Sequence, residues 1–464
     1  MRLWSISVRN LRIRAVASGL TILAIVVATG LYAAILMMAE QTEQRYKGSV
    51  GGYQAVVGPK DASQLEIVLN TIFHVGDAPG LIPLQTCIDL RSGRIGGRRS
   101  AVRYAIPQAR GDSVSQFNFP VIATIDEMFT TFERGGKPLP FAQGGPFEFS
   151  FDDMRRVADE LAAHETAVRT GADEVPPRPV LGDAMKRCVV GHRVHKKLGL
   201  ALGDVVTPVH GKMGEFGFHP HPEAACEVTG ILEPTNSPID STIFLPLGTH
   251  WLIDGHEAGV FVVEVPPGKN PDDAAKLPVN AGQLGLTAIV CDPKDYFGAQ
   301  FLRREFGKRG DAQVSWPQDV VPKFLRNMGS IADALLIIAW LVLFGAALSI
   351  SAVIYNTMNE RRREIAIMRS LGARRAQIFA IIVLEAGLLS LWGGALGLLA
   401  CHLTAFGCGG LVEDMTGVYL DWLQVGLWEL WLVLGVTGIG AFAGLLPAIK
   451  GSRTQVADSI AQNY

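Results

Sequence analysis

The sequence predicts a membrane protein with four transmembrane α-helices and a large α+β extracytoplasmic domain between helices 1 and 2. Three observations predict this fold class. Long apolar stretches, each able to cross a bilayer, recur along the 464 residues. Lysine and arginine gather in short segments beside these stretches. Residues 39–330 have the dispersed hydrophobic residues of a globular domain.

The first apolar stretch covers residues 16–38 and follows a basic flank that contains Arg2, Arg9, Arg12 and Arg14. Its length and the lack of a clear small-x-small cleavage site favour a retained first helix over a signal peptide. The other candidate spans are residues 331–355, 378–405 and 425–446.

The short flanks of the spans set the orientation, because cytosolic segments are enriched in lysine and arginine. The loop between the second and third spans carries Arg361, Arg362, Arg363, Arg369, Arg374 and Arg375, and the C-terminal tail carries Lys450 and Arg453. Residues 406–424 have no lysine or arginine and contain Glu413, Asp414 and Asp421. We therefore expect the N-terminus, the arginine-rich loop and the tail in the cytosol, and residues 39–330 on the other side.

Residues 39–330 mix short strand patterns with helical ones, which favours an α+β domain. The expected strands are 55–57, 205–209, 227–232, 242–246 and 260–265, and the expected helices are 63–73, 151–164, 192–198 and 293–306. Gly203 and Asp204 have the composition of a tight turn before a strand. Residues 171–179 are rich in Gly, Pro and charge and indicate a surface insertion.

The most informative segment, residues 359–398, joins a basic amphipathic stretch to an apolar span. It begins NERRREIAIMRSLGARR, so that Ile365, Ile367, Met368 and Leu371 lie among charged residues, mostly arginines. This pattern is typical of a short surface helix. Gly372 stands where such a helix needs a left-handed C-terminal cap.

This ordered stretch resembles the signature of the FtsX/MacB/LolC permease superfamily. The segments GHRVHKKLGLALGDVVTPVHG and CEVTGILEPTNSPIDSTIFLPL are similar to the periplasmic core of MacB-type permeases, and the tail LLPAIKGSRTQVADSI resembles the ending of the family. Gln455 departs from the Asp-Pro that the family often has there. The resemblance implies three regions: 1–38 with helix 1, 39–330 as a MacB-like core domain, and 331–464 as an FtsX-like permease domain with helices 2–4.

The resemblance also implies that the cytosolic loop is the coupling surface for an ATPase. The residues that match it are Glu360, Arg361, Glu364, Ile365, Met368, Arg369, Leu371 and Gly372. The chain has no G-x-x-x-x-G-K-[ST] sequence, so we expect ATP to be bound by a partner subunit, no cofactor in this chain, and a transporter subunit, not an enzyme. The alternative is that the arginines follow the positive-inside rule and bind anionic lipid.

The implied function is that of a permease subunit of an ABC transporter, which couples ATP hydrolysis by a separate subunit to movement of the extracytoplasmic domain for substrate export or release. One alternative is an FtsX-like signalling or scaffold protein that controls an extracytoplasmic partner. The resemblance further implies a cytoplasmic (inner) membrane location, an accessory protein as a possible partner, and a homodimer, since the chain has one set of four helices. A net charge of −2 gives no support for nucleic-acid binding.

One loop of the extracytoplasmic region has the side chains of a metal site. His210, His219, His221 and Glu223 fall within VHGKMGEFGFHPHPEAAC, and imidazole and carboxylate groups bind zinc. Two interpretations stay open: a zinc site, and solvent-exposed loop histidines without metal. A third function, a membrane-anchored metalloenzyme, would require such a site, but no H-E-x-x-H sequence occurs.

Further features leave alternatives open. Cys87, Cys188, Cys226 and Cys291 lie in the extracytoplasmic region, where disulfides or free buried thiols are both compatible with the sequence. The G-x-x-x-G pairs Gly393/Gly397 and Gly440/Gly444 predict close helix contacts, either in a dimer seam or within one subunit. Glu385 lies within a predicted span, where an ion or proton site and a structural hydrogen bond are both possible roles.

Overall fold

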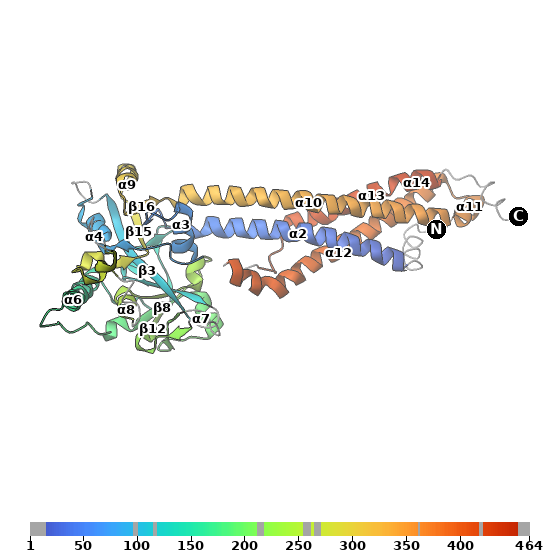
Figure 1. Cartoon of the computed structure of the whole chain (residues 1–464). Coiled ribbons are helices and arrows are strands. Elements are labelled where there is room, and N and C mark those ends of the chain that lie inside the picture. The colour runs from blue at the N-terminus through green and yellow to red at the C-terminus, as the bar shows by residue number, and fades with distance from the viewer. Residues whose placement is uncertain are drawn as a thin grey trace. The chain divides into compact units, whose positions relative to one another are not determined.

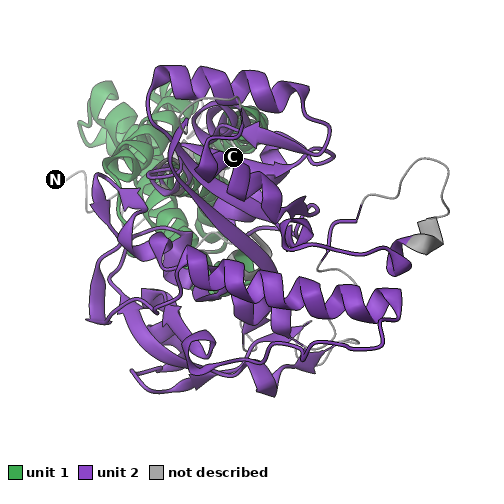
Figure 2. Cartoon of the chain, turned by 90° about the vertical axis from the view of Figure 1, so that its left-hand side faces the viewer, with its two compact units in different colours: residues 1–43, 326–464 green, residues 44–325 purple. Residues whose placement is uncertain are grey.

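The computed structural model describes residues 15–95, 101–114, 118–210, 218–253, 261–263, 271–360, 362–416 and 421–452. The chain divides into two compact units (Figure 2): unit 1 comprises residues 1–43 and 326–464, and unit 2 comprises residues 44–325. The boundaries between the units fall inside α2 (Ala15–Ser49) and α10 (Pro317–Glu360).

Unit 1 is helical. In the described part of the chain, four segments are long and apolar enough to span a membrane: Val16–Gln44, Pro317–Met358, Arg375–Val412 and Leu427–Ser452. They belong to α2, α10, α12 (Arg375–Thr416), and α13 (Leu427–Ala443) with α14 (Leu445–Ser452). Helices suit the interior of a bilayer because they satisfy nearly all of their backbone N–H and C=O groups internally. The fold class predicted from the sequence is confirmed.

The backbones of α2 and α12 approach closely at two glycines. A Cβ atom on Gly397 would lie 2.8 Å from Thr29 Cβ and 2.9 Å from Val26 O, and one on Gly30 would lie 3.2 Å from Gly397 O. One turn earlier on α12, a Cβ on Gly393 would lie 2.6 Å from the side chain of Ile25. The first G-x-x-x-G pair therefore packs against the first span of the same chain.

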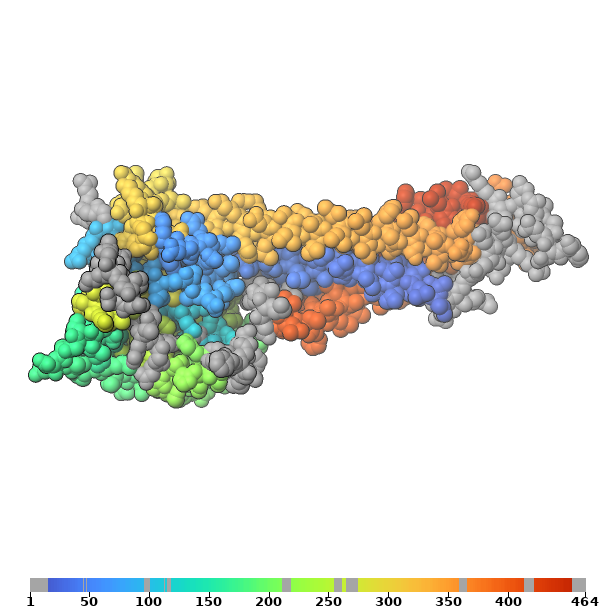
Figure 3. Space-filling model, viewed as in Figure 1, coloured from blue at the N-terminus to red at the C-terminus, as the bar shows by residue number. Residues whose placement is uncertain are grey.

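The second G-x-x-x-G pair packs the other side of α12 against α13. A Cβ on Gly440 would lie 1.6 Å from Ser390 Oγ, and one on Gly444 would lie 2.7 Å from Ala386 Cβ. Both glycine pairs thus form contacts inside one chain. Beside them, α2 and α10 run next to each other (Figure 3), with the rings of Tyr32 and Trp340 in edge contact at 5.8 Å.

Unit 2 is built on a mixed sheet with the described strand order β16-β1-β15-β3-β4-β13-β8-β12-β7 (Figure 1). These strands are β1 (Ala55–Pro59), β3 (Val102–Val114), β4 (Phe119–Thr124), β7 (Phe141–Gly144), β8 (Arg187–Val190), β12 (Cys226–Leu232), β13 (Ile243–Pro246), β15 (Ala288–Pro293) and β16 (Ala312–Ser315). The pairs β12–β8 and β13–β4 are parallel. Short strands β9 (Val205–Val206), β10 (Val209–His210) and β11 (His219–Pro220) lie off this path, and β2 (Ile82–Pro83), β14 (Gly285–Leu286), β5 (Glu133–Arg134) and β6 (Lys137–Pro138) form two small sheets.

Seven described α-helices lie entirely within unit 2: α3 (Gln64–Phe73), α4 (Leu84–Ser92), α5 (Glu127–Thr130), α6 (Phe151–Thr170), α7 (His192–Leu198), α8 (Leu247–Leu252) and α9 (Tyr296–Lys308). Of these, α3, α6 and α9 begin at side-chain caps. Ser63 Oγ accepts from Glu66 N at 3.1 Å, and Glu66 Oε2 accepts from Ser63 N at 2.7 Å, which completes a capping box. Asp295 caps α9 by accepting from Gly298 N at 2.8 Å.

Most of the expected elements of this domain are present with shifted ends. The expected strand 205–209 is broken into β9 and β10 because Pro208, between them, has no N–H to donate. Helix α6 continues to Thr170, where the left-handed Gly171 ends it. Of the expected strand 260–265, residues 260, 264 and 265 lie outside the described residues, and Phe261 forms only an isolated bridge with Leu284.

We predict that Gly397→Ala lowers the stability of unit 1 by about 1–3 kcal/mol, because the added methyl group overpacks the contact with α2. The matched control is Gly407→Ala on the same helix, where a Cβ meets nothing within 4 Å. Thermal unfolding of the purified protein in mild detergent measures both. Equal melting temperatures for the two variants would contradict the α2–α12 contact.

Candidate coupling element and extracytoplasmic sites

Helix α11 (Arg362–Ser370) connects the second and third spans and is anchored by one apolar side. Ile365 is 4% exposed and Ala366 is 2% exposed. Ile365 packs in a core cluster with Met358 at the end of α10 and Ile378 at the start of α12. The helix is therefore held against the cytosolic ends of two spans.

The turn after α11 has a left-handed cap. Ala373 N donates to Met368 O at 3.0 Å, and Gly372 has a φ of +96°, which disfavours any residue with a Cβ atom. Gln377 Oε1 then accepts from Arg374 N at 2.9 Å and starts α12. The sequence predicted this cap at Gly372.

Two apolar side chains of this element point outward. Leu371 is 82% exposed and Ile367 is 47% exposed. Of the other predicted coupling residues, Met368 packs against the core cluster and Arg369 is half-buried. Arg361 and the side chains of Glu360 and Glu364 lie outside the described residues. Ile367 was not among the predicted coupling residues, because its exposure depends on the rotational phase of α11.

The neighbouring end of α14 is tied to α10. Lys450 Nζ donates to the Tyr355 hydroxyl at 2.5 Å and lies 4.5 Å above the same ring. Nearby, Ser351 Oγ donates to Ala443 O at 2.6 Å. A force applied to α11 thus acts on helices that contact one another at their cytosolic ends.

In unit 2, the structure brings together the four predicted metal ligands. His210 and His219 are paired across β10 and β11. The buried ring of His221 lies 5.3 Å from that of His210 and 5.2 Å from that of His219, in edge contact with both. His221 Nδ1 lies 3.1 Å from Glu223 Oε1.

Within the described ranges, no group of three or more His, Cys, Asp or Glu side chains has the arrangement of a metal site. Residues 211–217, between β10 and β11, lie outside those ranges. The zinc prediction for His210, His219, His221 and Glu223 therefore stays a prediction.

The cysteines of unit 2 are buried free thiols. Burial raises the pKa of Cys87 to about 12 and that of Cys226 to about 12. Both thiols are consequently protonated at neutral pH, and the thiolate is the form that binds metals and attacks disulfides. Cys226, which follows the histidine cluster, is thus inert in this conformation.

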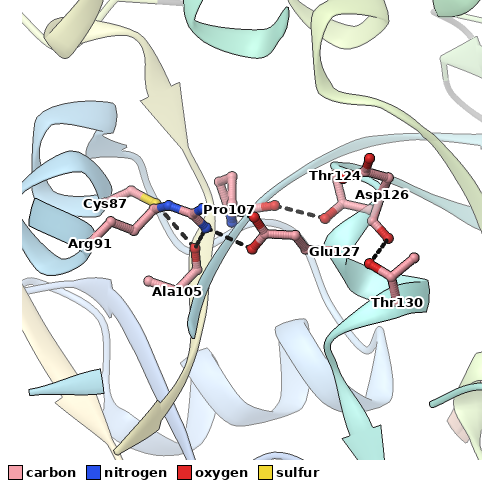
Figure 4. A network of polar contacts seen from close by, with 8 residues as sticks. All are labelled: Cys87, Arg91, Ala105, Pro107, Thr124, Asp126, Glu127 and Thr130. Atoms are coloured by element: carbon pink, nitrogen blue, oxygen red, sulfur yellow. Dashed lines mark hydrogen bonds and ion pairs between the residues drawn. The ribbon is translucent and has the colours of Figure 1, made fainter. Parts of the chain in front are cut away.

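A polar network joins α4, β3 and α5 (Figure 4). Arg91 donates to both carboxylate oxygens of Glu127 at 2.7 Å and to Ala105 O at 3.2 Å. Its guanidinium also lies 4.0 Å above the ring of Phe151. Bidentate pairing and stacking of this kind fix the arginine in one orientation.

The network forms one wall of a pocket of about 230 Å³, lined by Arg91, Val102, Arg103, Tyr104, Ala105, Glu127 and Thr131. Arg103 is paired with Asp292 at 3.0 Å, so both arginines of the lining have carboxylate partners. The pocket is charge-balanced, and Arg91 acts there as a structural cross-link.

The fold and these sites define a class of protein: a multi-pass membrane permease with an extracytoplasmic α+β domain between its first and second spans. The MacB-like periplasmic core domain matches residues 18–277, which is more than half of the chain, and the FtsX-like permease C-terminal family matches residues 336–456. The chain belongs to the MacB-like periplasmic core domain family and is an ABC transporter permease of the MacB and FtsX type.

Curated relatives have related names. An uncharacterized ABC transporter permease of Methanocaldococcus jannaschii is 31% identical over 33% of this chain and 38% of its own length. The macrolide export ATP-binding/permease protein MacB of Shigella sonnei is 28% identical over 39% of this chain and 28% of its own length. The protein of that name in Escherichia coli strain K12 matches with the same identity and coverage. The chain thus aligns with well under half of each relative.

We predict that Arg91→Leu loosens α4, because Glu127 and Ala105 O lose charged hydrogen bonds that contribute about 1.5–3 kcal/mol. Hydrogen exchange of peptides from Leu84–Ser92 in the full-length protein should become faster. Arg156→Leu is the control, since the side chain of Arg156 is 67% exposed in its ion pair with Asp153. Equal protection of this segment in the two variants would refute the cross-link.

Proposed function

We propose that this chain is the permease subunit of an ABC transporter and that a separate ATP-binding subunit docks on α11 and the turn that follows it. The exposed side chains of Leu371 and Ile367 support the proposal most directly. An exposed group of apolar side chains is more typical of an interaction surface than a single one, and this element presents two. ATP would be bound by the partner, and this chain would supply no cofactor.

The packing of α11 supports mechanical coupling. The side that carries Ile365 and Ala366 is buried, while Leu371 projects outward. Displacement of α11 by a partner would therefore press on Met358 of α10 and Ile378 of α12, which share its core cluster. Since packed interiors resist compression, the spans would move with α11. Through α10, the chain continues into the extracytoplasmic domain.

We further propose a homodimer in the cytoplasmic (inner) membrane that exports or releases a substrate, in keeping with the printed name of the macrolide export relatives. Both glycine pairs already form contacts inside one chain. The dimer interface would then use other, lipid-facing side chains.

The histidine cluster supports a second proposal, a zinc site formed by His210, His219 and His221 with Glu223. The observation that favours it is the approach of His221 to both other rings. Imidazole nitrogens are common zinc ligands, and three histidines form one known type of zinc site.

We predict that Leu371→Asp abolishes co-purification of the ATP-binding subunit, because a carboxylate would have to be buried in the apolar contact. The control is Val180→Asp in the extracytoplasmic domain, since Val180 is 81% exposed and Leu371 is 82% exposed. The protein is isolated from native membranes in mild detergent and its partners are identified by mass spectrometry. If Leu371→Asp retained the ATPase at the level of the control, the docking surface would be contradicted. If the arginine-rich loop bound only lipid, no ATPase would co-purify with the wild type either.

We predict that the full-length protein binds zinc and that the change of the exposed residue His219 to alanine weakens binding by at least about 10-fold, because the loss of a group that only orients a ligand already costs that much. Titration with zinc and elemental analysis after gel filtration measure affinity and stoichiometry. The control is His164→Ala, because His164 lies on α6 and its Nδ1 contacts Pro176 O at 2.7 Å, apart from the cluster. Equal zinc content in both variants would exclude the cluster as the site.

A further inference from the structure

At the outer end of unit 1, the segment 421–426 lies just before α13 and is docked on the helices around it. The side-chain amide of Gln41 on α2 donates to Asp421 O at 3.0 Å and accepts from Asp421 N at 2.9 Å. The ring of Trp422 lies 5.0 Å from that of Phe406 on α12. By the alternation of spans, this segment lies on the extracytoplasmic side.

A histidine–glutamate pair completes the docking. His402 Nδ1, on α12, lies 2.7 Å from Trp422 O, and His402 Nε2 lies 3.2 Å from Glu429 Oε2 on α13. The other carboxylate oxygen, Glu429 Oε1, accepts from Gly426 N at 2.9 Å. The side chain of Glu429 is 3% exposed and that of His402 is 15% exposed.

The partners of these atoms require a proton between the two side chains. Trp422 O only accepts hydrogen bonds, so His402 Nδ1 must carry hydrogen. A neutral imidazole would then present the lone pair of Nε2 to a carboxylate oxygen, and two acceptors repel each other. The contact is favourable when the imidazole carries a second hydrogen or the carboxyl group is protonated.

We propose that His402 and Glu429 form a proton-binding site that fastens the segment 421–426 to α12 and α13. The site holds one proton when the segment is docked. When this proton is lost at alkaline pH, the neutral imidazole has a single N–H, which cannot serve both Trp422 O and the buried carboxylate of Glu429. An unpartnered buried carboxylate is costly at this depth, so the N–H moves to Nε2 and donates to Glu429. The contact of Nδ1 with Trp422 O is then lost and the segment is released from His402, while its contact with Gln41 contains no titratable side chain.

Other titratable groups lie on the surrounding elements. Cys401 precedes His402 on α12 and is close enough to Glu429 to interact with its charge. Asp421 lies in the segment itself, where its Oδ1 accepts from Leu423 N at 3.0 Å. Glu40 and Glu43 flank Gln41 on α2, and both have interaction partners. None of these groups donates to or accepts from the His402–Glu429 contact within the described residues.

The variant Glu429→Gln tests the proposal because it changes the sign of the pH response. A glutamine amide donates to neutral His402 Nε2 while its oxygen still accepts from Gly426 N. The variant should therefore stay docked at alkaline pH and loosen at acid pH, where the imidazole gains its second hydrogen. The wild type should do the opposite.

Hydrogen exchange of peptides that cover 421–426 is measured in full-length protein in lipid nanodiscs, from about pH 5 to about pH 9. Comparison of proteins at the same pH removes the intrinsic pH dependence of exchange. We expect exchange in the wild type to exceed that in Glu429→Gln about tenfold at the alkaline end, as for one charge-assisted hydrogen bond. Identical pH profiles in the two proteins would overturn the proposal.

Two further variants separate docking from proton binding. His402→Asn keeps a donor for Trp422 O but not the contact with Glu429, so the pH response should disappear; a response of wild-type size would overturn the proposal even if Glu429→Gln failed to fold. Gln41→Leu should speed exchange by the same factor at every pH. If Gln41→Leu abolished the pH response, the pH dependence of exchange would come from the contact with α2. That result would also contradict a proton-binding site at His402 and Glu429.

Discussion

Close contact between α12 and its two neighbours is the constraint on which the permease unit depends. In lipid, apolar side chains gain nothing by leaving the solvent, so helices associate through dense packing and small residues. Gly397 admits α2 on one side of α12, and Gly440 admits Ser390 of α12 on the side of α13. The central helix thus has little freedom to slide against either neighbour, and motion of one span must involve the others.

Polar interactions are concentrated where the helices of this unit end. At the cytosolic end, Lys450 meets Tyr355, and at the outer end Gln41 and His402 hold the segment before α13. Between them, the described contacts are mainly apolar, with Thr29, Glu385 and Ser390 as buried polar exceptions. This distribution follows from the cost of polar groups in hydrocarbon.

The sequence revealed those features that depend on local composition. The spans, the cap at Gly372 and the strands β1, β12 and β13 follow from residues that are neighbours in the chain. The long central strand β3 was not predicted, because Pro107 and Gly111 are residues that usually interrupt a strand. In the structure, the pairing of β3 with β4 shifts its register between Arg110 and Ser113. The His402–Glu429 contact was also missed, since its members are 27 residues apart and meet only when two helices pack.

The packing of α2 against α12 also has a consequence for how the protein is assembled. Residues such as Thr29 and Gly30 cannot be replaced freely by other apolar residues, because they contact Gly397 of α12 closely. An apolar helix of equal length and hydropathy but with other residues would insert into the membrane equally well. It would clash with α12 or leave a cavity beside Gly393 and Gly397. During synthesis, the first helix therefore stays in the membrane without its partner on that side until Gly393 and Gly397 of the third span have been made.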